Sequence, residues 1–119
     1  MPAKSNTHIR NLALSVRQPF AEQIMIGEKK IEYRSKPTNI RERIYVYASK
    51  TPNKEAFRKI KKELSDFPVG VLVGTVEIVD CKEKSDEYHL LLANPQRLKK
   101  PMKADNRPQP VWFKPFKEK

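Results

Sequence analysis

The chain has 119 residues, which is enough for one domain and too few for two. Lys and Arg number 25 against 14 Asp and Glu, so the formal net charge is +11. A positive field of this size attracts polyanions, and it favours a nucleic-acid or nucleotide partner over a basic surface that is merely solvated. The single cysteine, Cys81, excludes an internal disulfide, and the two histidines are too far apart in the sequence for zinc-type ligand spacing. We therefore expect no metal and no other cofactor.

Residues 1–10 are polar and basic, and they predict a flexible N-terminus that lacks the apolar core of a signal peptide. No apolar run approaches the roughly 20 residues that a membrane-spanning helix needs. The sequence therefore predicts a monomeric cytoplasmic protein without membrane contact, or a nuclear protein if the source is a eukaryote.

The first third of the chain predicts a strand, a short helix and a second strand. The first strand covers residues 11–16. The helix starts at Gln18 and Pro19, because proline suits the first helical turn, and it continues for about two turns with apolar residues at helical spacing. Gly27 ends the helix, since glycine readily takes the left-handed conformation that follows many helices. The second strand covers residues 30–35.

Alternation of side chains assigns faces to two of the predicted strands. After the first helix, Glu32 and Arg34 share one face. In residues 43–49 the small apolar side chains share one face, and Tyr45 and Tyr47 share the opposite one. These two tyrosines form either a stacking platform or part of the packing beneath the helix that follows.

The rest of the chain predicts a second helix and further strands. The helix covers residues 54–64 and has a basic outer side. Residues 70–79 are apolar and rich in β-branched side chains, which predicts a central strand with a bulge or a close backbone approach at Gly74. A strand over residues 88–93 ends at an Asn-Pro pair, and a proline-rich wrap follows, with a short strand at residues 111–113. Together these elements predict an α+β, mostly β fold: a small, mostly antiparallel β-barrel of five to six strands with two helices at its ends.

Opposite charges gather where the first helix passes into the second strand. Lys29 leaves the turn, and Glu32 and Arg34 follow on one strand face. At the mouth of a barrel, such a cluster can bind a phosphate, contact the edge of a base or move a proton. By spacing alone, a structural Glu32–Arg34 ion pair with a solvated Lys29 is the commoner arrangement.

The pattern Gly27-x-Lys29-x-x-Glu32-x-Arg34 is similar to the G-x-K-x-x-E-x-R signature of the ASCH family. Residues 14–21 resemble the opening strand and helix start of that family, residues 68–81 its central strand, and residues 94–96 and 111–113 its closing elements. The resemblance covers residues 11–114, outside which lie the basic N-terminus and a basic tail at residues 115–119. It implies a PUA-like β-barrel.

The resemblance is greatest to the transcription-cointegrator-type members, and it implies a module that binds RNA or single-stranded nucleic acid. Some small members of the family hydrolyse acylated cytidine nucleosides, and a ribonuclease activity has been proposed for others. The cytidine hydrolases place a threonine nucleophile where this chain has Glu32, and a carboxylate cannot take the same part. If the chain is a metal-free hydrolase acting on a modified nucleoside or on RNA, Lys29 is the candidate base and Glu32 orients water. A third reading is a protein-interaction domain with an acidic partner.

The candidate ligand-binding residues are polar or charged side chains near the barrel mouth, together with the only tryptophan. They are Ser15, Arg17, Gln18, Lys29, Glu32, Arg34, Ser49, Lys50 and Trp112. Trp112 either stacks on a base or fills the barrel interior. The basic residues of the C-terminal segment, Arg107 among them, predict nonspecific phosphate contacts or no contact at all.

Overall fold

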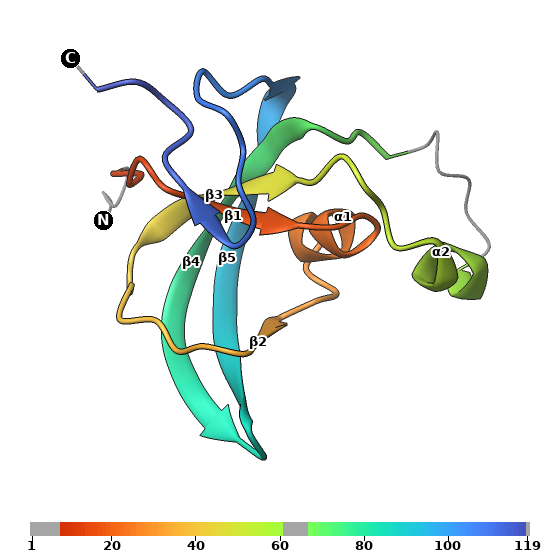
Figure 1. The fold of residues 1–119 in the computed structure, drawn as a ribbon, viewed down its shortest axis with the longest axis vertical. Helices are drawn as coiled ribbons and strands as arrows, with labels where there is room; N and C mark the ends of the chain where they lie inside the picture. Colours follow the sequence, from red (N-terminus) through yellow and green to blue (C-terminus); the bar gives the residue numbers. More distant parts are fainter. Residues whose placement is uncertain (1–7, 61–66, 119) are drawn as a thin grey trace.

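The computed structural model describes residues 8–60 and 67–118. Over these residues the chain forms one six-stranded sheet and two helices (Figure 1). Their bounds, in chain order, are β1 (Ala13–Val16), α1 (Phe20–Met25), β2 (Ile31–Arg34), β3 (Arg43–Ala48), α2 (Lys54–Ile60), β4 (Val71–Lys84), β5 (Glu87–Met102) and β6 (Trp112–Phe113). The predicted helix over residues 54–64 is confirmed as far as Ile60, and its remainder lies outside the described residues.

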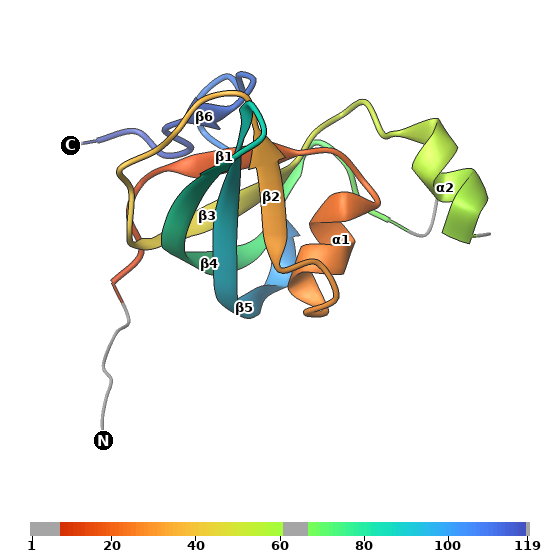
Figure 2. The same ribbon diagram turned by 90° about the horizontal axis from the view of Figure 1, so that it is seen from below.

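The sheet has the strand order β2-β5-β4-β3-β1-β6, and every neighbouring pair is antiparallel except β1 and β3. It curls until β2 comes close to β1 (Figure 2). The Nη2 group of Arg34 on β2 donates to the backbone oxygen of Ser15 on β1, at 2.8 Å. A side chain therefore bridges the two strands, and we call this line the β1–β2 seam. The predicted mostly β barrel with two helices is confirmed as a curled half-barrel.

The hairpin of β4 and β5 is longer than the sequence predicts. Residues 88–93 were expected to end at the Asn-Pro pair, but β5 continues to Met102, so that boundary is wrong. Between the pairs Thr75↔Gln96 and Glu77↔Ala93, β5 has one residue more than β4, and Asn94 there has φ +52°. A bulge accepts both a proline and a positive φ without ending the strand.

The turn of this hairpin was also missed, because Ser-Asp is a weaker turn signal than Asn-Gly. Ser85 and Asp86 have φ of +48° and +69°, as a two-residue hairpin turn of type I′ requires. Lys84 and Glu87 form the last pair of the ladder beside it.

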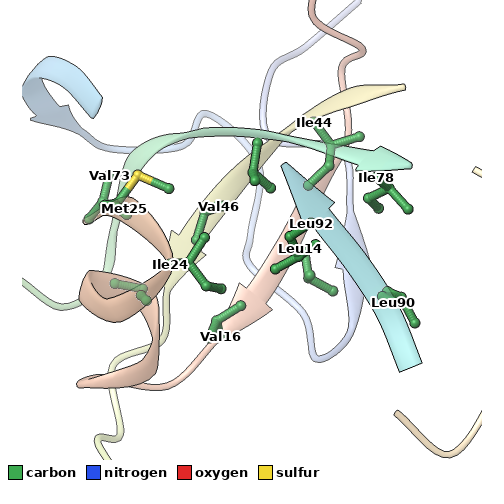
Figure 3. Close-up of a cluster of buried hydrophobic side chains, with 13 residues drawn as sticks. Leu14, Val16, Ile24, Met25, Ile44, Val46, Val73, Ile78, Leu90 and Leu92 are labelled. Atoms are coloured by element: carbon green, nitrogen blue, oxygen red, sulfur yellow. The ribbon is translucent and has the colours of Figure 1, made fainter. Parts of the chain in front are cut away.

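Helix α1 closes one side of the main core (Figure 3). Ala21, Ile24 and Met25 pack against the concave face of the sheet, including Leu14, Val46 and other apolar residues of β1, β3, β4 and β5. Gly74 on β4 lies beneath the helix, and a Cβ atom there would meet the Met25 sulfur and, at 2.5 Å, the backbone oxygen of Gln96. The predicted close approach at this glycine is confirmed. So is the left-handed helix end at Gly27, with φ +83°.

The two tyrosines of β3 belong to a second cluster, on the other face of the sheet. Tyr47 packs edge-on against Phe113 with ring centroids 5.2 Å apart, and Tyr45 packs against Phe116 at 5.3 Å. Burial raises the pKa of both phenols. The alternation along β3 is confirmed, but the packing partners are C-terminal aromatic residues and not the second helix. In both views α2 lies to one side of the sheet (Figures 1 and 2), and neither helix of the described residues is long and apolar enough to cross a membrane.

Candidate functional site

A cleft of about 400 Å³ opens along the β1–β2 seam. Two facing strands form its walls, and the start of α1 and a C-terminal loop complete the lining. The lining residues are Ser15, Val16, Arg17, Phe20, Glu32, Tyr33, Arg34, Ser35, Ser49, Pro110 and Val111. The volume lies within the range of roughly 300–1,000 Å³ that small-molecule sites occupy. We call this the seam cleft.

The carboxylate of Glu32 lies between two cations in the wall of the seam cleft. Arg34 Nε donates to Glu32 Oε2 at 2.9 Å, and Nη2 reaches the same oxygen. Lys29 Nζ lies 3.4 Å from Oε1. Glu32 is 8% exposed, so the charge is nearly buried, and the two cations beside it offset part of its desolvation. The face that carries Glu32 and Arg34 therefore points into the barrel mouth, and the predicted ion pair forms there.

Arg34 is oriented by two partners and still has unpaired N–H donors. A guanidinium carries five N–H groups. Those of Nε and Nη2 are used by Glu32 and by the Ser15 backbone. Among the described residues, nothing accepts from Nη1. A side chain only 18% exposed thus lines the cleft with two unpaired donors, which a ligand can satisfy.

Lys29 lies behind the lining of the seam cleft and is not part of it. Its Nζ is 4.9 Å from the ring centroid of Tyr33 and 5.4 Å from that of Phe20, and both rings do line the cleft. Together with the Glu32 contact, these cation–π interactions place the ammonium where it orients three lining side chains. The arrangement makes Lys29 a positioning residue for the cleft.

Tyr33 is a site residue that the sequence analysis missed. Its ring is exposed, with 51% of the residue accessible, and it packs edge-on against His89 at 4.7 Å. His89 in turn contacts Glu87 at 3.0 Å. Alternation puts Tyr33 on the strand face opposite Glu32. Its position between two charged residues is the one signal in the sequence that could have marked it as a site residue. Among the described residues, no group of three or more His, Cys, Asp or Glu side chains could hold a metal ion.

A second cleft of about 350 Å³ continues from the first. It lies between the ends of β1 and β3 and the C-terminal loop, and we call it the loop cleft. Its lining residues are Ser15, Arg17, Tyr47, Ser49, Lys50, Thr51, Arg107, Pro108, Gln109 and Pro110. Four of these also line the seam cleft: Ser15, Arg17, Ser49 and Pro110. The two clefts therefore lie side by side.

The structure brings six of the nine predicted site residues into the linings of these clefts. Lys29, described above, Gln18 and Trp112 lie outside both linings. Gln18 is fully buried: its Nε2 donates to the Pro68 oxygen at 2.9 Å and its Oε1 accepts from the Glu22 backbone at the same distance. Its amide fixes the start of α1 and leaves nothing for a ligand. Trp112 pairs with Leu14 across β1 and β6 and packs against the main core, and neither cleft includes it.

The sequence model of the ASCH domain matches residues 14–107. This chain belongs to the ASCH domain family. It is 28% identical to human activating signal cointegrator 1 over 83% of its own length, and it spans about a fifth of that protein, 21%. The crystal structure of ASCH from Zymomonas mobilis superposes with a TM-score of 0.61 at 15% identity, covering 86% of this chain and 85% of the bacterial one. A point mutant of that protein gives a TM-score of 0.60 at 16% identity with the same coverage. The ASCH resemblance and the PUA-like fold are thereby confirmed.

Proposed function

We propose that this ASCH domain binds single-stranded nucleic acid, RNA foremost, with one base held in the seam cleft. The observation that carries the proposal is the nearly buried Glu32–Arg34 pair beside an exposed tyrosine. Arg34 offers free donors and Glu32 offers acceptor capacity side by side, which suits the donor and acceptor groups on a base edge. Tyr33 supplies a ring for stacking, worth about 1–3 kcal/mol per base in single-strand binders.

The charge of the whole chain supports the same partner. A formal net charge of +11 draws a polyanion towards the clefts and makes binding depend on salt. The position of Lys29 favours binding over hydrolysis, because its ammonium is engaged by Glu32 and by two aromatic rings. A base in a hydrolase needs a lone pair and access to the reacting atoms.

The proposal is tested by fluorescence anisotropy with short labelled single-stranded RNA at low salt. Glu32→Gln raises the net charge by one, so a purely electrostatic partner would bind this variant at least as well. We expect it to lose about tenfold in affinity instead, since Arg34 loses its orientation and a base loses an acceptor. Glu22→Gln is the matched control: Glu22 pairs with Arg97, which lines neither cleft, and the change in charge is identical.

Two results would contradict the proposal. Wild-type protein that is not retained on RNA at low salt would exclude it, and so would equal affinities for Glu32→Gln and Glu22→Gln. The same mixtures are run on a denaturing gel, together with acylated cytidines as substrates. Turnover by wild type that is lost in Lys29→Ala would assign a hydrolase in place of a binding module.

A further inference from the structure

The loop cleft brings together three cations from segments far apart in the sequence. Arg17 follows β1, Lys50 follows β3, and Arg107 lies in the C-terminal loop. All three are exposed, and none of them takes part in an ion pair within the described part of the chain. Other exposed cations, Arg58 and Lys84 among them, also lack a carboxylate partner in the described residues, but they line neither cleft. Positive charge at the loop cleft is therefore left for an external anion.

The fold positions the segments that carry two of these cations. The side chain of Lys50 runs over Gly70, where a Cβ atom would lie only 3.2 Å from the Lys50 Cγ. The loop that carries Arg107 is fixed on both sides. Ser15 Oγ donates to the Gln109 backbone oxygen at 2.7 Å, and Asn106 Nδ2 donates to the Lys114 oxygen at 2.9 Å. Cations on fixed segments lose less conformational entropy when they meet an anion.

The hydroxyl groups of the loop cleft suit the same kind of ligand. Ser49 and Thr51 lie in its lining beside Lys50. A phosphodiester is a tetrahedral monoanion that accepts hydrogen bonds from guanidinium, ammonium and hydroxyl groups. Because Ser15, Arg17, Ser49 and Pro110 line both clefts, an anion in the loop cleft would lie next to a base in the seam cleft.

We propose that the loop cleft is a phosphate subsite that holds the backbone next to the base in the seam cleft. The inference rests on the proposed function and narrows the ligand: a nucleotide within a strand is bound, and a free nucleoside is not enough. Lys50 contacts the phosphate from the end of β3, and Arg107 contacts it from the C-terminal loop. Arg17, in the lining of both clefts, lies where the strand passes from one to the other.

The test combines variants with a neutral linkage in the probe. Short single-stranded oligonucleotides are prepared with one phosphate at a time replaced by an uncharged methylphosphonate. Lys50→Ala and Arg107→Ala should each weaken binding of the unmodified probe by about tenfold at low salt. One methylphosphonate position should weaken wild-type binding by a similar factor, and should have little further effect on Arg107→Ala. Such non-additivity identifies the phosphate that the loop cleft holds.

Matched controls remove one charge of the same kind outside the clefts. Lys84→Ala changes the tip of the β4–β5 hairpin, and Arg58→Ala changes α2; both residues are exposed and neither lines a cleft. We expect much smaller losses from them. Inorganic phosphate and nucleosides serve as competitors, and neither should displace the probe at concentrations at which a nucleoside monophosphate does.

The outcomes separate the two proposals. If Glu32→Gln weakens binding while Lys50→Ala and Arg107→Ala match their controls, the seam cleft stands and the phosphate subsite is wrong. The phosphate subsite would also be wrong if the affinity losses from Arg107→Ala and from the methylphosphonate were additive at every position of the probe. If inorganic phosphate alone displaces the oligonucleotide probe, the loop cleft is a site for a free anion and the proposed subsite is wrong. If wild-type protein binds no oligonucleotide, both proposals fail.

Discussion

The carboxylate of Glu32 is the charged group on which the seam cleft depends. It has little access to water, and it draws Arg34 Nε to 2.9 Å and Lys29 Nζ to 3.4 Å. Removing such a charge leaves a partly buried guanidinium without its counter-ion, whose desolvation is then uncompensated. The pair therefore links stability and the proposed binding at a single residue.

Glu32→Ala should accordingly destabilise the fold. We expect a loss of about 1–3 kcal/mol in the free energy of unfolding, the usual cost of leaving a buried polar partner unsatisfied. Glu22→Ala breaks an ion pair in which Arg97 is 47% exposed, and exposed pairs contribute about 0–1 kcal/mol. Urea denaturation of both variants measures the difference. Equal losses would mean that the Glu32 charge is better solvated than its burial indicates.

At the scale of the element, β3 separates two packing environments. Its tyrosines face the aromatic residues of the C-terminal segment, while its other face belongs to the main core. Burial raises the pKa of Tyr45 and of Tyr47 above the ordinary value of 10.0. In the unfolded chain the phenols ionise near that ordinary value, so the folded state holds their protons more tightly.

Stability should therefore depend on alkaline pH. Because the folded pKa values are raised, the contribution of the tyrosines is fully present below pH 10 and is lost as the pH rises past it. The midpoint temperature of thermal unfolding of the wild-type protein should fall above pH 10. The double variant Tyr45→Phe, Tyr47→Phe should fall less steeply, since it lacks these titrating groups. Parallel curves would show that lysines and the remaining tyrosines account for the decline.

Helix α1 depends on Gly74 for its contact with the sheet. A methyl group at this position would overlap the Met25 sulfur and a backbone oxygen, and a backbone cannot move aside as a side chain can. Gly74→Ala should cost about 1–3 kcal/mol through overpacking. The additional truncation Met25→Ala should restore only part of this loss, because the Gln96 oxygen remains. Calorimetric unfolding of the single and double variants measures both effects, and full restoration would place the strain on the sulfur alone.

The sequence predicts local patterns better than it predicts long-range geometry. Alternation predicted the shared face of Glu32 and Arg34, and glycine preferences predicted the close approach at Gly74 and the turn at Gly27. The bulge that carries β5 past Asn94 was not predictable, because an extra residue is tolerated only when a partner strand is in place. Arg107 reaches the loop cleft through a C-terminal loop. The path of this loop is set by contacts with Ser15 and Asn11, which lie 94 and 105 residues from their partners in the sequence. No pattern near Arg107 carries that information.

At the scale of the whole molecule, the +11 charge and the cations of the loop cleft contribute differently to binding affinity. The dependence of affinity on salt concentration distinguishes the two contributions. Each phosphate neutralised on a single strand lowers the slope of log K against log salt by about 0.7. Lys50 and Arg107 share one phosphate, and Arg17 lies where the strand passes to the seam cleft. One to two neutralised phosphates thus predict a slope of about −0.7 to −1.4 for wild type. Lys50→Ala and Arg107→Ala should each make it shallower, by no more than about 0.7 because they share that phosphate, whereas Lys84→Ala should leave it unchanged. Anisotropy titrations over a range of salt concentrations measure the slopes. If all three variants shift the slope equally, the diffuse charge of the chain, and not the loop cleft, attracts the strand.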